Sequence, residues 1–275
     1  MLAFGCQSCE TTHTNELFTI RTDGRGLKML RRACGEQGDP DFPAWSPDGE
    51  RLAYSCNFAS GGGIWTSRAD GSGGRPLTQA ARRFEQYEPA WSANGRQLAW
   101  DRRAFSSQTW SIVVSGADGS GERLLAKGLS PSWSRRGRLV FASGSGLATI
   151  GADGSRRWRL LGRGVGRGRP AWSPNGRSIA FVDADHGEVA VRVVDLTNYR
   201  VRTLARVRVN PAENPVSTAW SPDSRWLAYG IGGTPAKSKN SYARVELWAV
   251  RVVDGASTQV YSGEANAIRG ISWRP

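Results

Sequence analysis

Histidine, methionine and long apolar runs are scarce in this chain. Among 275 residues there are two methionines and two histidines, His13 and His186. Neither histidine belongs to a His-Glu-x-x-His pair or has a second ligand nearby, so we expect no histidine-based metal site. No apolar run approaches the roughly 18 residues that a membrane span requires, so we expect no transmembrane segment. These absences argue against a histidine metalloenzyme and against a membrane-spanning protein.

Sequence signatures of catalysis are also missing. The chain has no Gly-x-Ser-x-Gly motif, so we find no nucleophile elbow of an α/β-hydrolase. Its glycine clusters at 61–63 and 144–146 lack the Lys-Ser/Thr pair and the following helix of a phosphate-binding loop. The opening residues Met1–Cys6 lack the charged and apolar regions of a secretory signal. We therefore expect a protein that is not an enzyme, with no catalytic residue, no metal and no cofactor.

One short phrase, in contrast, recurs six times along the chain. Its fullest copy is Pro43-Ala44-Trp45-Ser46-Pro47-Asp48-Gly49, and the tryptophans of successive copies lie 39 to 53 residues apart. A repeat of roughly 40–50 residues that is built from short strands and turns is typical of a β-propeller blade. Because the tryptophans occupy one blade position, we expect them to pack between neighbouring blades rather than to bind a ligand. They are Trp45, Trp91, Trp133, Trp172, Trp220 and Trp273.

Each repeat contains the signals of four strands. In the repeat after Phe42 they cover 42–46, 51–55, 64–68 and 75–78, with Pro-Asp-Gly and Asp-Gly turns between them. The chain opens on the pattern of a second strand, Met1–Cys6, and ends on that of a first strand, 268–273. We predict an all-β, six-bladed β-propeller with four antiparallel strands per blade. Its last blade is closed by N-terminal strands plus one C-terminal strand, and residues 1–275 form a single domain.

These repeats resemble the TolB-type β-propeller family. The resemblance rests on Pro-Ala-Trp-Ser-Pro-Asp-Gly-x-x-Leu-Ala-Tyr followed by Ala-Asp-Gly-Ser-Gly, and it covers essentially the whole chain. The turns depart from this pattern at Arg135-Arg136-Gly137, Asp195-Leu196 and Asp223-Ser224. The family implies a non-catalytic protein- or peptide-binding scaffold, in the periplasm or elsewhere in the cell envelope, or outside the cell. The alternative is the substrate-gating propeller of a prolyl-oligopeptidase-like or tricorn-like peptidase, or of a related hydrolase, whose catalytic domain is not in this chain.

The chain is strongly basic. Its formal net charge is +13 with a pI near 10.4, and most of the positive charge is arginine. A charge of this size is typical of proteins with an anionic partner, although scattered arginines also suit solvated outer strands. A nucleic-acid binder and a carbohydrate-active or lyase-type propeller are two less favoured alternatives. We expect a monomer that binds a protein or peptide, with an acidic partner compatible with the charge and nucleic acid not expected.

All four cysteines lie in the first fifth of the chain. Cys6 and Cys56 end equivalent second strands of adjacent predicted blades, Cys9 follows the first of them, and Cys34 lies in the connection between the two blades. The topology therefore brings all four to one sector of one face. We predict two disulfides that link the closing blade to its neighbour, which suits an exported protein. A zinc site that uses Cys6-x-x-Cys9, or free buried thiols, are the alternatives.

The same face is predicted to collect the longer loops. Three of them are the segments 101–108, 162–169 and 231–243. Variable loops on a rigid scaffold are a common place for binding, the alternative being solvated loops with no ligand. Positions three or four residues before the repeat tryptophans are expected to form the rim of the central channel. The candidate binding residues of the loops and the rim are Asp41, Glu88, Arg102, Arg103, Arg167, Arg169, Lys237, Lys239 and Arg269.

Overall fold

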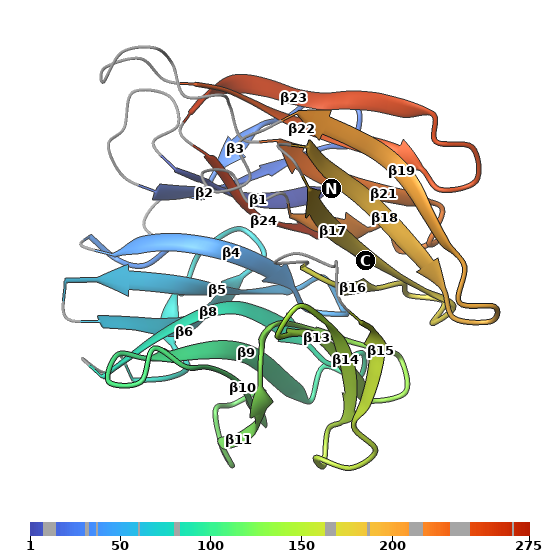
Figure 1. Ribbon diagram of the computed structural model, residues 1–275. Helices are drawn as coiled ribbons and strands as arrows, with labels where there is room; N and C mark the ends of the chain where they lie inside the picture. The colour runs from blue at the N-terminus through green and yellow to red at the C-terminus, as the bar shows by residue number, and fades with distance from the viewer. Residues whose placement is uncertain are drawn as a thin grey trace.

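Six four-stranded antiparallel sheets follow one another around a ring in the computed structural model (Figure 1). The structure describes residues 1–7, 15–30, 33–36, 38–59, 61–79, 83–162, 169–185, 188–208, 217–231, 243–265 and 267–275. All secondary-structure elements in these ranges are strands. No helix long and apolar enough to cross a membrane occurs among them. The predicted all-β, six-bladed propeller with four antiparallel strands per blade is therefore confirmed.

We number the blades from the one that contains both chain ends, and each is given from its innermost to its outermost strand. Blade 1 contains β24 (Ala267–Trp273), β1 (Leu2–Gln7), β2 (Asn15–Ile20) and β3 (Lys28–Met29). Blade 2 contains β4 (Asp39–Trp45), β5 (Arg51–Phe58), β6 (Gly61–Arg68) and β7 (Arg75–Pro76). Blade 3 contains β8 (Phe84–Trp91), β9 (Gln97–Ala104), β10 (Trp110–Gly116) and β11 (Arg123–Lys127).

The second half of the ring follows the same order of strands. Blade 4 contains β12 (Leu129–Trp133), β13 (Arg138–Ser143), β14 (Gly146–Gly151) and β15 (Trp158–Leu161). Blade 5 contains β16 (Ala171–Trp172), β17 (Ser178–Asp185), β18 (Glu188–Asp195) and β19 (Val201–Arg208). Blade 6 contains β20 (Thr218–Trp220), β21 (Trp226–Ile231), β22 (Ala243–Arg251) and β23 (Ser257–Ala265).

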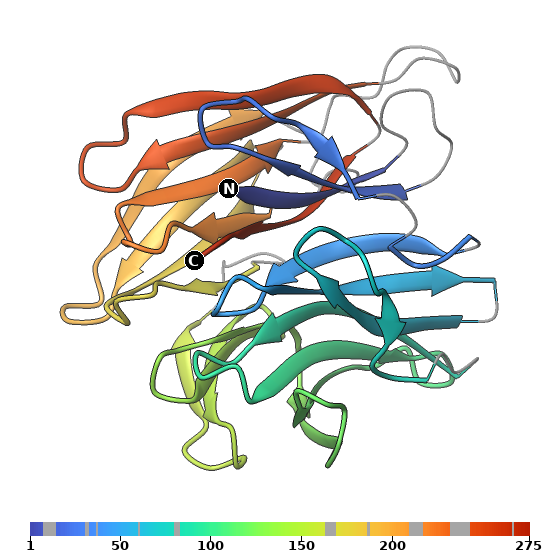
Figure 2. The ribbon, with the colours of Figure 1, turned by 180° about the vertical axis from the view of Figure 1, so that it is seen from behind.

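The two ends of the chain close the ring by pairing within blade 1. Strand β1 runs antiparallel to β24, in a register from Leu2 opposite Trp273 to Gln7 opposite Ala267. The Arg274 amide also donates a hydrogen bond of 2.8 Å to the Met1 carbonyl oxygen. Figures 1 and 2 show the dark blue and red strands side by side from both sides. The predicted closure by N-terminal strands and one C-terminal strand is confirmed.

The repeat tryptophans lie at the seams between blades. Trp91 and Trp133 are 8% exposed, and their indole nitrogens donate to the carbonyl oxygens of Ala44 and Ala90 in the preceding blade. Trp220 makes the same bond to the preceding blade, to the Ala171 oxygen. These bonds add a directional contact to the burial of a large ring. Packing between neighbouring blades is therefore the structural role of these rings.

Two seams use a serine in place of this indole bond. Where the preceding inner strand carries serine instead of alanine, the serine hydroxyl accepts a bond from the backbone amide of the next repeat tryptophan. Ser272 accepts from Trp45 and Ser132 accepts from Trp172, each at 2.9 Å. Where serine replaces alanine, the tryptophan therefore donates to the preceding blade through its backbone amide and not through its indole nitrogen.

The strand connections divide between two faces of the ring. On one face, second strands connect to third strands and each blade connects to the next; we call it the loop face. We call the turn face the opposite one, where tight turns join first to second and third to fourth strands. The Ser-Pro-Asp-Gly turns of the turn face are held locally, since Ser46 Oγ donates to Asp48 and accepts from the Arg51 amide at 2.9 Å. Short turns on one face leave the longer connections to the other.

Candidate functional site

The innermost strands are distorted where they line the mouth of the central channel. Strands β4, β8 and β12 each contain a β-bulge at this level. In the bulges Phe42, Glu88 and Ser130 adopt left-handed φ values of 51°, 52° and 56°. Residues other than glycine adopt this conformation at a cost, and such strain is concentrated at functional sites. The residues three positions before the repeat tryptophans line a central cavity of about 230 Å³: Phe42, Glu88, Ser130, Arg169, Ser217 and Gly270.

Two ion pairs join different blades at this mouth. Arg169, just before β16, lies 3.0 Å from Glu88 of β8, and both side chains are 17% exposed. Arg269 of β24 lies 3.5 Å from Asp41 of β4 and also donates to the Gln7 side chain at 2.9 Å. The first pair connects blades 3 and 5, and the second connects blades 1 and 2. Four of the predicted rim residues therefore form two ion pairs that join different blades around the channel.

Two carboxyl groups near the channel mouth are almost completely buried. Asp41 is 1% exposed, and burial raises its pKa to about 7, although the Arg269 guanidinium acts in the opposite direction. Asp101 is 2% exposed, and burial followed by repulsion from Glu88 raises its pKa well above the usual range. One oxygen of Asp101 accepts a hydrogen bond of 2.9 Å from the Ser130 amide. The mouth thus contains carboxyl groups that take up protons more readily than those at a protein surface.

The sequence prediction did not include Asp101 among the site residues. It placed Asp101 at the start of a loop, whereas β9 continues through Ala104. A signal was present, because the same position of the other five second strands carries a small or apolar residue. Those residues are Gly5, Ser55, Ala142, Val182 and Gly230. A carboxylate at a position where every sister blade has a small or apolar residue is a candidate functional residue.

Several polar atoms at the mouth are buried without a hydrogen-bond partner among the described residues. They include Asp101 Oδ1, Ser130 Oγ and Arg169 Nη1. A buried polar group that lacks a partner costs about 1–3 kcal/mol. A molecule that offers both donors and acceptors would recover this free energy. The mouth can therefore hold a polar ligand in a defined orientation.

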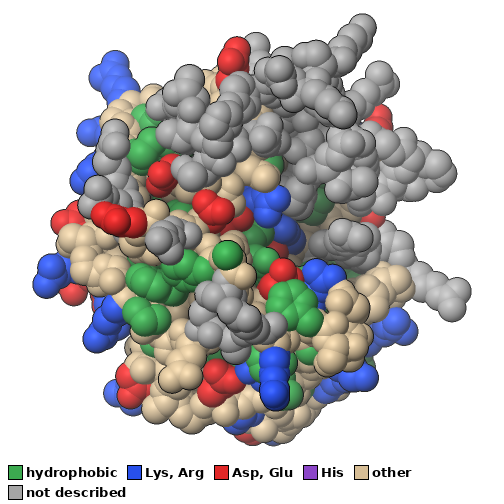
Figure 3. Space-filling model, turned by 90° about the vertical axis from the view of Figure 1, so that its left-hand side faces the viewer, with side chains coloured by type: hydrophobic (Ala, Val, Ile, Leu, Met, Phe, Trp, Pro, Cys, Tyr) green, Lys and Arg blue, Asp and Glu red, His purple; other side chains and the backbone are tan. Residues whose placement is uncertain are grey.

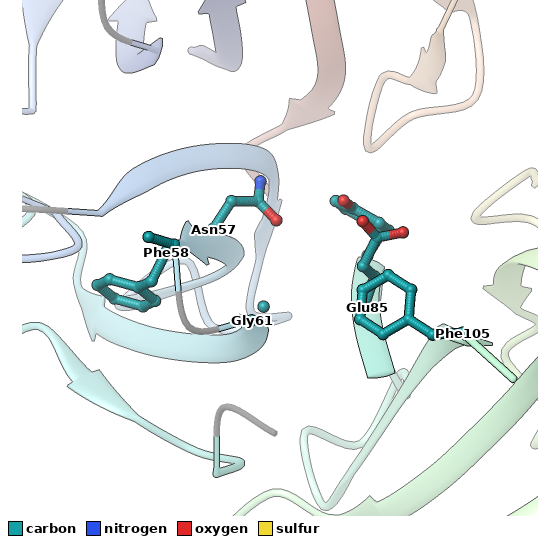
Figure 4. Close-up of a pocket in the computed structure, with 8 residues that line it drawn as sticks. Asn57, Phe58, Gly61, Glu85 and Phe105 are labelled. Atoms are coloured by element: carbon teal, nitrogen blue, oxygen red, sulfur yellow. The ribbon is translucent and has the colours of Figure 1, made fainter. Parts of the chain in front are cut away.

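A larger pocket of about 550 Å³ lies beside the mouth, between blades 2 and 3 on the loop face (Figure 4). Asn57 and Phe58 from the end of β5 form one side, and Glu85 and Phe105 form the other. Glu85 is held by Arg103 at 3.2 Å. This volume and this mixture of aromatic and polar groups are typical of ligand sites.

Tyr87 connects the pocket to the channel mouth. It lines the pocket, and its ring lies 5.9 Å from the ring of Phe42 and 6.0 Å from that of Trp110. Burial raises the pKa of the Tyr87 hydroxyl to about 12, and the nearby Glu85 carboxylate adds to this, so the group remains a protonated donor at neutral pH. The ring is fixed from two sides, which keeps this donor in place.

The structure changes the environment that was expected for two candidate arginines. Arg102 and Arg103 lie within β9 and not in a loop from 101 to 108. Arg102 forms an ion pair with Glu122 and lies over the ring of Phe84, at 4.6 Å from its centroid. Arg103 is held by Glu85, as described above. The expectation of a loop was wrong because the alternation of the strand continues beyond Asp101. The candidates Arg167, Lys237 and Lys239 lie outside the described residues.

A disulfide joins the connection after blade 1 to blade 2. Cys34 and Cys56 are bonded, with their Cα atoms 5.7 Å apart. Cys6 is also disulfide-bonded, and its partner lies outside the described residues, as does the candidate Cys9. A cysteine in a disulfide cannot supply a thiolate to a metal, and no cluster of three or more potential ligands occurs in the described part of the chain. The bond ties the wall of the pocket, one residue before Asn57, to the preceding connection.

The charges of the loop face are mixed. Figure 3 turns this face toward the viewer and shows acidic and basic side chains interspersed on its described part. Blade 3 carries five basic and five acidic residues between Phe84 and Lys127, a formal charge of zero. A partner on this face therefore meets alternating charges, which set orientation more than long-range attraction.

Six blades of four strands around a polar channel define the chain as a six-bladed β-propeller. No protein-family model matches it. The Tol-Pal system protein TolB of Gluconobacter oxydans is 30% identical over 137 residues, which is 50% of this chain and 23% of that protein. The propeller is TolB-like in its repeats. The aligned segment spans less than a quarter of that curated relative.

Solved structures show the same likeness at the level of the fold. TolB from Acinetobacter baumannii superposes with a TM-score of 0.77 and 16% identity, over 100% of this chain and 66% of that chain. A putative TolB from Agrobacterium tumefaciens superposes with a TM-score of 0.71 and 16% identity, over 94% of each chain. The predicted resemblance to the TolB-type β-propeller family is confirmed.

Proposed function

We propose that this chain is a non-catalytic, protein- or peptide-binding propeller of the cell envelope, and that its partner binds the loop face. The observation that carries the proposal is the continuity between the pocket of blades 2 and 3 and the polar channel mouth. The TolB-like repeats support it, since the curated relative is named as a component of the Tol-Pal system. The propeller acts here as a rigid frame that presents fixed polar groups.

A peptide segment suits this surface better than a small apolar molecule. Tyr87 and Asn57 provide hydrogen-bonding groups in the pocket, and Asp101 and Arg169 provide unpaired atoms at the mouth. An extended chain offers a donor and an acceptor at every residue, so it can satisfy both sets at once. The strained bulges of the inner strands hold these groups in position before binding, which lowers the cost of association.

The cysteines support an envelope location. Cys34, Cys56 and Cys6 are disulfide-bonded, and disulfides persist in oxidising compartments such as the periplasm. Fractionation of the native host, followed by electrophoresis without reductant, tests this part of the proposal. We expect the protein in the envelope fraction with no thiol open to alkylation. Recovery from the cytosol with reduced cysteines would contradict it.

Site-specific photo-crosslinking in the native host tests the binding face. We would place benzoyl-phenylalanine at Phe105, which lines the pocket and is 40% exposed, and at Leu124 on β11, which is 60% exposed. We expect a discrete adduct with a protein at position 105, and a weaker adduct when Asn57→Ala removes a polar group of the pocket. Leu124 is the matched control, on the outer strand of the same blade. Adducts of the same proteins at the two positions would refute binding through the loop face.

A further inference from the structure

A second groove lies on the other side of the ring, between blades 4 and 5 near the turn face. Its volume is about 470 Å³. Blade 4 contributes Arg138 at the start of β13, and Arg156, Arg157 and Trp158 at the β14–β15 turn. Blade 5 contributes Tyr199 from the β18–β19 turn. We call this the blade 4–5 groove.

The arginines of this groove are not neutralised by carboxylates. Arg138 donates to the Thr149 hydroxyl and to the Arg156 carbonyl oxygen, each at 2.9 Å. Arg157 donates to the Ser143 hydroxyl at 3.1 Å, and its guanidinium lies 5.9 Å from the centroid of the Phe141 ring, on the face of blade 4 that packs toward blade 3. Within the described residues none of the three groove arginines forms an ion pair. Their positive charge is therefore available to an anionic partner.

This local charge is unusual within the chain. Between Leu129 and Leu161, blade 4 carries six arginines and one acidic residue, Asp153, which is a formal charge of +5. Blade 2 carries three basic and five acidic residues between Asp39 and Pro76, a formal charge of −2. Both blades form the same four-stranded sheet, so the fold does not require this charge. Blade 4 thus carries +5 of the formal net charge of +13.

Two large aromatic side chains are exposed at the same place. Trp158 is 65% exposed and Tyr199 is 61% exposed, whereas Trp91 and Trp133 at the seams are 8% exposed. Exposed rings next to arginines are the residue types that contribute most to protein interfaces. Packing within the propeller does not explain these rings, because they contribute little to its core.

The backbone at the groove is strained in a way that the sister blades avoid. Arg156 has a φ of 51° in the β14–β15 turn. The three blades with the same turn place glycine there, and Gly26, Gly73 and Gly121 have φ values of 68°, 67° and 62°. Tyr199 is left-handed too, with a φ of 58°. Side chains in this conformation carry a conformational cost, which is kept where it serves a function.

We propose that the blade 4–5 groove binds an acidic segment of a partner protein. Carboxylates of that segment pair with Arg138 and Arg156, and an apolar side chain between them packs against Trp158. Leu160, Trp172 and Leu196 also line the groove, and such a lining suits an aliphatic or aromatic side chain more than a phosphate chain. Guanidinium groups recognise carboxylates through paired hydrogen bonds. This site lies apart from the loop face and does not depend on the function proposed for it.

Fluorescence anisotropy at low ionic strength tests the proposal. The probe is a short fluorescein-labelled peptide that alternates Glu and Asp with Leu and Phe, and its amide counterpart with Gln and Asn is the control ligand. We expect the acidic peptide to bind and the amide peptide to bind at least about tenfold more weakly, a difference of 1.4 kcal/mol. No binding of the acidic peptide, or equal binding of the two, would overturn the proposal.

Protein variants locate the site. We expect Arg156→Glu and Trp158→Ala to weaken binding by about tenfold or more, and Arg75→Glu to leave it unchanged. Arg75 is exposed and occupies the position of Trp158 in the turn of blade 2. Arg156→Gly restores the residue of the sister turns, so we expect weaker binding with an unchanged or higher melting temperature. This variant separates a binding defect from misfolding.

A nucleic-acid probe provides the final discrimination. Single-stranded oligothymidylate of matched charge is titrated into the same variants under the same conditions. We expect it to bind more weakly than the acidic peptide. Tighter binding of the oligonucleotide that is lost in Trp158→Ala would overturn the proposal and assign the groove to nucleic acid. Equal peptide binding by the wild type and all the groove variants would also overturn it.

Discussion

The arginines of the channel mouth and those of the blade 4–5 groove differ in their partners. Arg169 and Arg269 are paired with carboxylates of other blades, at 3.0 Å and 3.5 Å. Among the described residues, Arg138 and Arg157 donate to neutral oxygens and to no carboxylate. The arginines of this chain therefore serve two purposes. Those of the channel mouth join blades, and those of the blade 4–5 groove remain available for binding. Net charge alone does not locate a binding surface, because pairing decides which charges are free.

The acidic groups of the two regions differ in the same way. Asp41 and Asp101 are buried at the mouth, and burial raises the pKa of each. Asp153 and Asp195 lie in exposed turns beside the groove, and hydrogen bonds from Ser155 and Thr197 lower the pKa of these two carboxyl groups. The mouth is consequently the region that responds to pH near neutrality, whereas the charge of the groove stays constant there.

The largest expected effect is on the pH dependence of stability. The pKa of Asp41 is about 7 in the folded protein against 3.8 in the unfolded chain, so the folded state retains a proton that the unfolded state releases. Its contribution to the free energy of unfolding is complete below about pH 4 and is lost as the pH rises through about 7, by up to about 4 kcal/mol. Urea unfolding across this range should show a smaller decline for Asp41→Asn.

A matched variant on the other side of the ring sharpens this comparison. Asp153→Asn removes a carboxyl group whose pKa is lowered and which lies in an exposed turn. We expect it to leave the decline between pH 4 and 7 as in the wild type. The assignment to Asp41 fails if Asp41→Asn retains the full decline of the wild-type protein.

The disulfide should have the next largest effect. Cys34 and Cys56 enclose a sequence separation of 22 residues, and closing a loop of this size stabilises a protein by about 3 kcal/mol in the chain-entropy treatment. We expect the double variant Cys34→Ala, Cys56→Ala to lose about this free energy of unfolding in urea. It should also weaken crosslinking at Phe105, while peptide binding by the blade 4–5 groove is retained. Loss of both activities together would indicate global unfolding instead.

Breaking the ion pair at the mouth should have a smaller effect. Glu88→Gln leaves Arg169 without a carboxylate, and both side chains are 17% exposed. We expect a loss of about 2 kcal/mol, below the range for completely buried pairs because some solvent reaches this one. Arg251→Gln is the control, since the Arg251–Asp254 pair is 46% exposed on both sides and should contribute nothing measurable. Equal losses in the two variants would contradict a stabilising role for the Glu88–Arg169 pair.

Exchanging arginine and glycine between the sister turns should have the smallest effects on stability. The effects of the two variants should have opposite signs. Arg156→Gly is expected to stabilise the protein by about 1 kcal/mol because glycine adopts a positive φ without strain. Gly121→Arg is expected to destabilise it by about the same amount. Gly121 has a φ of 62° and open space where a Cβ would lie. The destabilisation is therefore expected to come from backbone strain and not from a steric clash. Thermal unfolding measures both, and destabilisation by Arg156→Gly would refute the strain at the groove.

Much of the fold could be predicted because its signals are local and repeated. Each Ser-Pro-Asp-Gly turn is held by its own residues, as with Ser46 and Asp48. The match between Met1–Cys6 and the second strands predicted the closing blade, because a strand needs a partner for its backbone groups. The wedge position of the tryptophans followed from their spacing alone. None of these predictions required knowledge of contacts between distant residues.

The site was less predictable because its properties depend on contacts between blades. Asp101 looked like the start of a loop, yet burial beside Ser130 makes it part of the mouth. Arg102 looked like a free loop cation, yet Glu122 neutralises it. Trp158 lies on the outer strand β15 and is 65% exposed, whereas Trp91 and Trp133 on inner strands are buried at the seams between blades. The sequence around one residue does not give its distance to residues that are far away in the chain.

The sequence by itself determined the number of blades, the closure of the ring and the positions of the turns, since backbone hydrogen bonding and turn geometry act over a few residues and repeat from blade to blade. Only the tertiary structure decided which charges are paired, which carboxyl groups are buried and which aromatic rings remain exposed. Electrostatic free energy and burial depend on separations in space between residues that lie far apart in the chain. Those separations exist only once the blades have packed.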